Sequence, residues 1–160
     1  MLIEMHIKGL MLDPVTNVPI VVLKDSENQR ALPIWVGPVE ANAIALQVEN
    51  VAPPRPMTHD LFRRLLTAMG ASVSRVVIAE LRGSTYYAYL EIERGAERLF
   101  LDARPSDALA IALRTRAPVF VTPDVLDQAR SLEVSSEQAD QERLQRWLES
   151  LDPDDMGYKM

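Results

Sequence analysis

An internal repeat constrains the fold of this chain more than any other feature of its sequence. When the chain is shifted by 67 residues, segment 32–47 aligns with segment 99–114, and seven of the 16 aligned pairs are identical. Chance would give about one or two identities over such a length. Pro38 aligns with Pro105, and a run of small apolar residues follows each proline. We interpret the match as an internal duplication, although a small-residue helix packed on a sheet could reach the same pattern by convergence.

Alternating apolar residues and turn residues predict the same order of elements in both halves of the chain. Each half reads as three strands followed by a helix, and a further helix over residues 58–69 links the halves. The expected strands span 2–12, 19–23, 32–36, 73–82, 85–93 and 97–103, and the repeated helices span 38–50 and the residues from 106 onward. The sequence therefore predicts an α+β fold, with a mixed or antiparallel sheet built from two βββα-like repeats and a linking helix.

The linking helix has the clearest boundaries. Thr58 can cap its first N–H groups, and Gly70 suits a left-handed exit at its C-terminal end. Its apolar residues recur at helical spacing and predict one apolar face, made of Leu61, Phe62, Leu65, Leu66 and Met69.

The net charge of −6 argues against a nucleic-acid binder, since neutralising phosphates requires a basic surface, but the charge is unevenly distributed. Residues 133–160 hold eight acids and three bases, whereas residues 1–132 hold 15 acids and 14 bases. A capping box at Ser135 and Gln138 predicts a last helix in the acidic part. Its apolar stripe consists of Leu144, Trp147, Leu148 and Leu151. We therefore expect a main domain over 1–132 and an acidic C-terminal helical tail over 133–160.

The composition is typical of one compact domain, with 48% hydrophobic and 25% charged residues in a chain of 160. No apolar run approaches about 18 residues, and Glu4 and Lys8 interrupt the first apolar stretch, so neither a membrane span nor a signal peptide is expected. The absence of cysteine excludes disulfides, thiolate zinc sites and cysteine nucleophiles. We expect a cytoplasmic protein without membrane association.

The first segment that could carry chemistry is the proline-rich approach to the linking helix, residues 53–61. The start of a helix presents free N–H donors and favours anions. His59 could move a proton near neutral pH as a general acid or base, with Asp60 beside it, and Arg55 could hold a phosphate. The alternative is that Asp60 only complements the helix dipole and His59 is a packed or solvated residue.

The second segment is the strand-to-helix junction at residues 102–108. Asp102 and Asp107 bracket Arg104, so the carboxylates could hold Mg²⁺ or Mn²⁺ while the guanidinium faces a phosphate. The repeat places Glu40 at the equivalent position to Asp107, and a pseudo-twofold axis could bring both acids to one pocket. The alternative is structural, with Ser106 as an N-cap, Asp107 answering the helix dipole and Asp102 paired with Arg104.

Three ordered motifs resemble the bifunctional nuclease domain family. They are Leu-Pro-Ile-Trp-Val-Gly at 32–37 with Glu40-Ala41, Pro-Pro-Arg-Pro-Met-Thr-His-Asp at 53–60, and Asp-Ala-Arg-Pro-Ser-Asp-Ala at 102–108. The resemblance covers about residues 1–130. It implies an α+β domain in the bacterial cytoplasm that often self-associates, with DNase and RNase activity in some members. It implies no assignment of catalytic residues.

Two functions follow as hypotheses. The first is a nuclease that hydrolyses DNA or RNA with a divalent metal, Mg²⁺ or Mn²⁺, held by carboxylates in a homo-oligomer, with a dimer favoured. Its catalytic residues would be His59, Asp60 and Asp107, its phosphate clamps Arg55 and Arg104, and its metal ligands Glu40, Asp102 and Asp107. The second is a non-catalytic oligomeric module that binds a ligand or a protein. The acidic balance favours it, as does the lack of P-loop, nucleophile-elbow, zincin and common nuclease motifs.

Overall fold

The protein has an α+β fold, as the sequence predicts. The computed structural model describes residues 1–129 and 132–133 of the chain. The elements along the chain are β1 (Ile3–Leu12), β2 (Pro19–Asp25), β3 (Arg30–Trp35), α1 (Pro38–Val48), α2 (Thr58–Ala68), β4 (Ser72–Arg82), β5 (Thr85–Arg94), β6 (Glu97–Ala103), α3 (Pro105–Thr115), β7 (Val119–Val121), α4 (Pro123–Gln128) and β8 (Leu132–Glu133). The order βββα therefore occurs twice, with α2 between the two units, while duplication as its origin stays a prediction.

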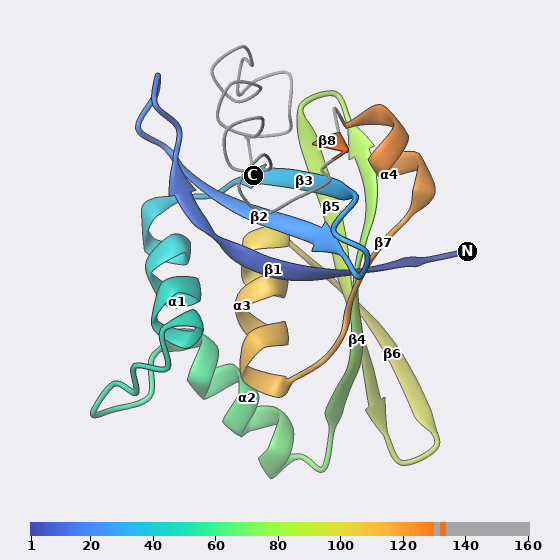
Figure 1. Cartoon of the computed structure of the whole chain (residues 1–160). Coiled ribbons are helices and arrows are strands. Elements are labelled where there is room, and N and C mark those ends of the chain that lie inside the picture. Colours follow the sequence, from blue (N-terminus) through green and yellow to red (C-terminus); the bar gives the residue numbers. More distant parts are fainter. Residues whose placement is uncertain (130–131, 134–160) are drawn as a thin grey trace.

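All strands join one mixed sheet, in the order β6-β5-β4-β7-β1-β2-β3-β8 (Figure 1). Strands β1, β2 and β3 form one antiparallel meander, and β4, β5 and β6 form another. The short strand β7 lies between the meanders, parallel to β4 and antiparallel to β1. The two helices that follow the meanders, α1 and α3, contact each other.

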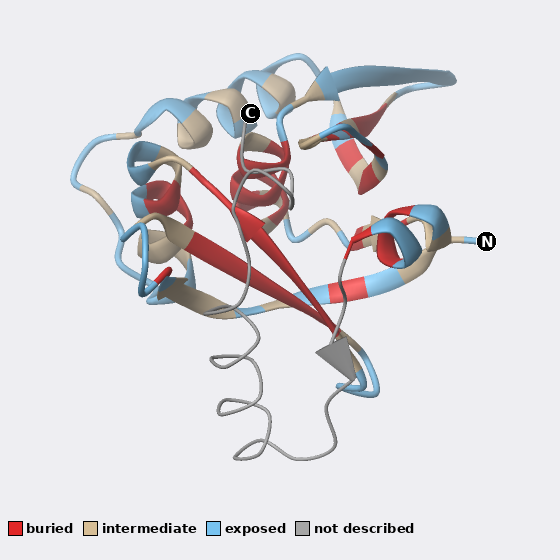
Figure 2. Cartoon of the chain, turned by 90° about the horizontal axis from the view of Figure 1, so that it is seen from above, coloured by how far each residue is buried: buried red, intermediate tan, exposed pale blue. Residues whose placement is uncertain are grey.

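Helix α3 is the centre of the helical layer. It contacts α1, α2, β4 and β5, and eight of its 11 residues are buried. Figure 2 shows buried residues concentrated in α3 and in β2 and β3. Small side chains such as Ala108, Ala110 and Ala112 let α3 approach its neighbours closely. Because α3 touches both other long helices, a side chain near its start can meet groups from α1 and from α2.

Two helix starts differ from the sequence-based prediction. The N-cap of α2 is Met57, not Thr58, and the Asp60 carboxylate accepts the Met57 N–H at 2.9 Å. The N-cap position of α3 is occupied by Arg104, so Ser106 lies inside the helix, fully buried, and its hydroxyl has no hydrogen-bond partner among the described residues. In α2 the aspartate at the third position thus takes the place that the prediction gave to the Thr58 hydroxyl, whereas in α3 no side chain caps the helix start.

The apolar face expected on α2 is divided. Phe62 and Leu66 pack against the core, whereas Leu61, Leu65 and Met69 are each more than half exposed. Gly70 has the expected left-handed conformation, with φ of +70°. The predicted last helix falls outside the described residues, and the domain boundary between residues 132 and 133 stays a prediction. Within the described part of the chain, no helix is long and apolar enough to cross a membrane.

Candidate functional site

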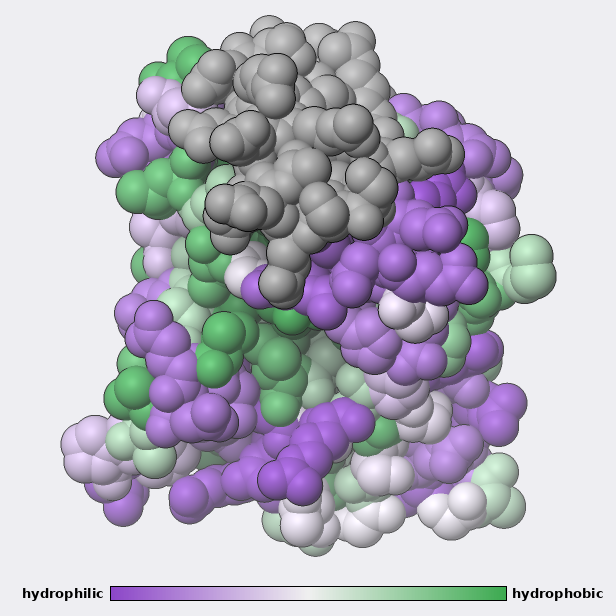
Figure 3. Space-filling view, viewed as in Figure 1, coloured by the Kyte–Doolittle hydropathy of each residue, from purple (hydrophilic) through white to green (hydrophobic). Residues whose placement is uncertain are grey.

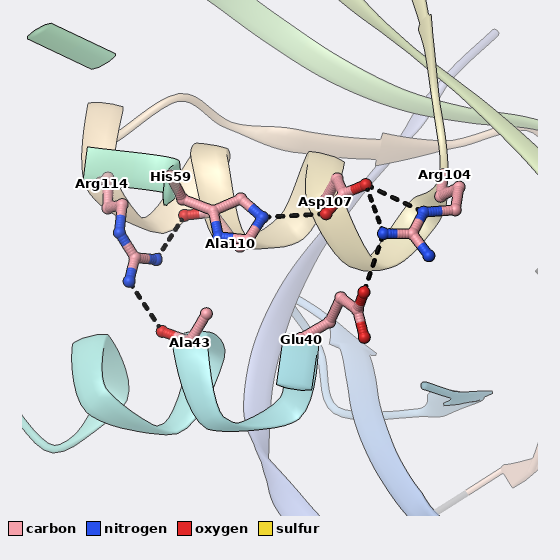
Figure 4. Close-up of polar contacts among 7 residues, drawn as sticks. All are labelled: Glu40, Ala43, His59, Arg104, Asp107, Ala110 and Arg114. Carbon is pink, nitrogen blue, oxygen red and sulfur yellow. Dashed lines mark hydrogen bonds and ion pairs between the residues drawn. The ribbon is translucent and has the colours of Figure 1, made fainter. Parts of the chain in front are cut away.

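Arg104 joins the two strand-to-helix junctions. Its Nε donates to Oδ2 of Asp107 at 2.9 Å, and its Nη2 donates to Oε1 of Glu40 at 2.8 Å (Figure 4). Arg104 has an extended backbone, as expected for a residue before proline. Glu40 and Asp107, the two acids aligned by the repeat, are thus brought to the same place. They meet around a guanidinium, whose pKa is raised by its hydrogen bonds to Asp107 and Glu40.

A glycine leaves the space that Glu40 uses. A β-carbon added at Gly37 would lie 2.5 Å from Oε2 of Glu40, which is closer than side chains approach each other. The backbone of Gly37 is extended, so a preference for glycine at this junction comes from the neighbouring carboxylate, whose end would have to shift for a larger residue, and not from a special backbone angle.

His59 binds the other oxygen of Asp107. The His59 Nε2 to Asp107 Oδ1 distance is 2.8 Å, and the two side chains come from α2 and α3 (Figure 4). The hydrogen bond with His59 lowers the pKa of Asp107, and Arg104 lowers it further, although burial opposes both. An ionised Asp107 can only accept hydrogen bonds, so Nε2 of His59 carries the hydrogen. In the neutral imidazole Nδ1 is then the nitrogen that can accept a proton. The His59 side chain is 13% exposed. We call Glu40, His59, Arg104 and Asp107 the junction network.

Asp60 and the buried Arg114 form a second ion pair that ties three helices together. Arg114 Nε donates to Oδ1 of Asp60 at 2.7 Å, Nη1 donates to the Ala110 carbonyl and Nη2 donates to the Ala43 carbonyl. Burial raises the pKa of Asp60, but hydrogen bonds from the Met57 amide and from Arg114 outweigh it, so this pKa lies below its usual value. Both oxygens of Asp60 have partners within the chain, so these contacts indicate that it positions α2.

The sequence reasoning missed Arg114. Its side chain is 3% exposed, an unusual environment for an arginine, and it bonds to α1, α2 and α3 at once. The available signal was an arginine directly after the apolar run 108–113, where the repeat has Gln47.

Two predicted site residues lie apart from the junction network. Asp102 lies in β6, opposite Tyr89 of β5. Together with Phe100 it lines a separate hollow of about 410 Å³. Arg55 is exposed in the segment before α2 and makes no hydrogen bond or ion pair within the described residues. The structure therefore brings Glu40 and Asp107 together, but not Asp102.

The predicted metal ligands do not form a cation site as arranged. Arg104 occupies the space between the Glu40 and Asp107 carboxylates, where a shared cation would bind. In residues 1–129 and 132–133 no group of three His, Cys, Asp or Glu side chains could hold a metal ion. A requirement for Mg²⁺ or Mn²⁺ stays a prediction from the sequence.

A basic hollow of about 490 Å³ opens beside the Asp60–Arg114 pair. Its ionisable lining residues are Arg63, Arg114, Arg116 and Asp60, and hydroxyls from Thr67, Ser72 and Thr115 also line it. Arg63 and Arg116 are exposed and have no ion-pair partner in the described part of the chain. On the face shown in Figure 3, hydrophilic residues gather where α2 and α3 end. A smaller hollow of about 200 Å³, lined by Arg64 and three prolines, shares Arg63 with it.

The fold and the site together define an α+β domain with a carboxylate-oriented imidazole next to arginines, an arrangement suited to proton transfer beside an anion. The chain belongs to the bifunctional nuclease domain family, whose model matches residues 21–133. The match runs from β2 to β8 and includes every residue of the junction network.

The relatives divide into two groups. An uncharacterised protein of Mycobacterium tuberculosis is 40% identical over 161 residues, covering 95% of this chain and 96% of the relative. Bifunctional nuclease 1 of Oryza sativa subsp. japonica is 30% identical over 112 residues, and bifunctional nuclease 1 of Arabidopsis thaliana is 29% identical over 107 residues. These matches cover 68% and 64% of this chain but 34% and 33% of the plant proteins. The plant nucleases therefore contain much that this chain does not match.

Proposed function

We propose that this protein is a nuclease that hydrolyses phosphodiester bonds in DNA or RNA. The observation that carries the proposal is the His59–Asp107 hydrogen bond beside Arg104, within the region that matches the family. The Asp107 carboxylate stabilises the positive charge that develops when the His59 imidazole takes up a proton. It also fixes the ring nitrogen that is free to take up that proton. His59 is accordingly the general base and Asp107 its positioning residue.

The reaction balances with these groups. Water attacks phosphorus as His59 Nδ1 takes one of its protons, and a new O–P bond forms. The bond from phosphorus to the leaving oxygen breaks, and that oxygen takes the proton of the imidazolium, directly or through a water molecule. His59 returns to its starting state.

Arg104 is the group that contacts the phosphate. Its Nε and Nη2 bind Asp107 and Glu40, so the guanidinium is held in one orientation. The side chain is 47% exposed, and Nη1 makes no hydrogen bond within the described residues. Two N–H groups thus remain for a phosphate oxygen, in a geometry that needs little rearrangement.

The basic hollow binds flanking phosphates of the substrate. Arg114 follows Asp107 by seven positions in α3, which is about 10 Å along a helix axis. The hollow carries three arginines and one aspartate, whereas residues 1–132 together are close to neutral. We also assign a phosphate contact to Arg55, which is exposed in the segment before α2. Because α3 itself is mostly buried, a strand of nucleic acid that spans the hollow and the junction network crosses the outer surface of the helical layer.

We also propose, independently of the roles of His59 and Arg104, that hydrolysis depends on a divalent metal ion. Because Arg104 already binds Glu40 and Asp107, no step above is routed through a metal ion. Addition of EDTA to the purified protein tests the claim directly, and unchanged hydrolysis would remove it. We also expect a cytoplasmic protein that acts as a homo-oligomer.

A non-catalytic binding module is the second candidate. The observation that favours it is that every charged group of the junction network has a partner inside the chain. In that case the network only joins α1, α2 and α3, and the basic hollow binds an anionic ligand without chemistry.

The test compares two histidine variants on single-stranded DNA and RNA. His59→Ala should lower kcat by on the order of 10²-fold or more, because a general base contributes that much. His6→Ala is the matched control, since His6 is the other histidine of the chain and is half exposed on β1. Equal rates for His59→Ala, His6→Ala and wild type would mean that the activity comes from a contaminant or from another site, and would favour the binding module.

A further inference from the structure

Strand β6 is an unusual edge of the sheet. Among the described strands it pairs with β5 alone, in an unbroken antiparallel register from Glu97 to Ala103. Six of its seven residues are exposed. The centre of the strand is apolar, with Leu99, Phe100 and Leu101 exposed by 47%, 63% and 44%. Edge strands normally carry charges, prolines or bulges at such positions, because an open regular edge pairs with other strands.

Apolar side chains emerge on both faces of this edge. Leu99 and Leu101 are opposite Ile92 and Leu90, which belong to the core, so these leucines continue the face that the helices cover. Phe100 lies on the other face, where its ring and the Tyr89 ring make an edge-to-face contact with a centroid distance of 5.8 Å. One neighbouring strand would cover both sets of side chains, whereas a helix or loop on one face would cover only one set.

The charges of β6 are self-complementary. Arg98 and Asp102 lie two residues before and two residues after Phe100, on the same face of the strand. In an antiparallel pair of identical strands centred on Phe100, Arg98 is opposite Asp102 of the second copy, and Leu99 is opposite its Leu101. Centring the pair on Leu99 or Leu101 instead loses both opposite-charge pairs. The sequence thus selects one register of pairing with itself.

We propose that β6 pairs antiparallel with β6 of a second copy of this chain, around a twofold axis at Phe100. The two sheets then form one continuous sheet, and the contact is isologous, as in most symmetric dimers. This interface lies on the opposite side of β6 from β5 and does not use the junction network. It gives Asp102 a role in association, in place of the metal-ligand role predicted from the sequence.

A single cysteine tests the axis. The chain has no cysteine, so Phe100→Cys introduces one thiol per subunit. Residues directly opposite each other in an antiparallel pair have Cα atoms about 4.5 to 5.5 Å apart, within the range that a disulfide spans. Mild oxidation should convert most of this variant into a covalent dimer. Tyr87→Cys is the matched control, because Tyr87 is an exposed aromatic residue on the same face but in β5, away from the axis. Its crosslinking should be slight.

A charge exchange tests the register. Asp102→Arg places two arginines opposite each other and should raise the dimer dissociation constant at least tenfold, measured by sedimentation equilibrium. Adding Arg98→Asp restores opposite charges and should recover most of the affinity. Arg98 also binds Glu91 and Glu93 in its own chain, so the melting temperature of each variant is measured as well. If the double variant fails to fold, the crosslinking result decides.

Three outcomes would overturn the proposal. They are a wild-type chain that stays monomeric at high micromolar concentration, equal crosslinking of Phe100→Cys and Tyr87→Cys, and a dimer whose dissociation constant is unchanged by Asp102→Arg. The last would move the interface to another surface, such as the exposed side of α2. None of these measurements depends on nuclease activity, so the interface and the proposed function can fail separately.

Discussion

The junction network and the basic hollow use the same residue types in opposite ways. In the network, Arg104 donates to the Glu40 and Asp107 carboxylates and the His59 imidazole binds Asp107, so the groups are fixed relative to each other. In the hollow, Arg114 is saturated, since each of its three nitrogens donates within the chain, but Arg63 and Arg116 have no ion-pair partner among the described residues. The difference separates two tasks. Charges that are paired inside the chain hold a geometry, and unpaired charges attract a ligand of opposite sign.

Removing the saturated arginine of the hollow should have the largest effect. Arg114→Met removes the donor to Oδ1 of Asp60 and the side-chain donors to the Ala43 and Ala110 carbonyls in a largely buried place. Breaking such a pair costs about 3 kcal/mol of unfolding free energy. Urea denaturation measures the loss. Arg116→Ala in the same hollow is the control, and it should change stability by less than about 0.5 kcal/mol, because Arg116 is exposed. Equal losses of unfolding free energy in the two variants would show that Arg114 and Arg116 do not differ in their contribution to stability.

The sequence predicts the parts of this arrangement that local rules govern. Helices α1 and α3 each begin at a proline, and these starts follow from the backbone preference of proline for the first helical position. The repeat indicates that Glu40 and Asp107 occupy equivalent junctions. The hydrogen bond between His59 and Asp107 joins residues 48 positions apart. It depends on how α2 packs on α3, and no periodicity in either helix contains that information.

The position of Arg104 was also beyond local rules. A residue before Pro105 is expected to be extended, but its partner could be any nearby acid. The structural alternative paired it with Asp102, which precedes it by two residues, whereas it bonds to Asp107 and to Glu40, 64 residues away. Strand alternation places Asp102 on the sheet face with Phe100, and this direction separates it from the helix starts.

Removing the unpaired arginines should change binding and leave chemistry intact. Arg63→Ala combined with Arg116→Ala should weaken binding of a labelled single-stranded oligonucleotide about tenfold at low salt. The slope of log affinity against log salt should fall by about 1.4, because each phosphate contact with a single strand contributes about 0.7. KM should rise while kcat stays constant, since neither arginine touches the reacting atoms.

Arg94→Ala is the control for this pair of variants. Arg94 is an exposed arginine that pairs with Glu97 at the β5–β6 turn, so its removal changes the net charge without touching the hollow. Fluorescence anisotropy over a series of salt concentrations gives both affinities and slopes. A control slope that falls as much as that of the double variant would mean that the whole surface, and not the hollow, attracts the strand.

The smallest effect is the pH dependence of stability, and both regions should contribute to it. The pKa of Asp107 is lowered by His59 and Arg104, and that of Asp60 is lowered by the Met57 amide and Arg114 against the effect of burial. A carboxyl whose folded pKa lies below its unfolded value of about 3.9 stabilises the protein at every pH above that value. The contribution is lost as the pH falls from about 4 through the folded pKa. In this range the unfolded state binds the proton first, because its carboxyl has the higher pKa. Unfolding free energies measured by denaturation between pH 7 and pH 2 should therefore fall at the acidic end.

Asp60→Asn and Asp107→Asn should each make that fall shallower by less than one proton, which is at most about 1.4 kcal/mol per pH unit. An unchanged slope in Asp107→Asn alone would mean that His59 and Arg104 bind this carboxylate too weakly to hold the junction network together, and the division between a fixed network and an attracting hollow would lose its first half.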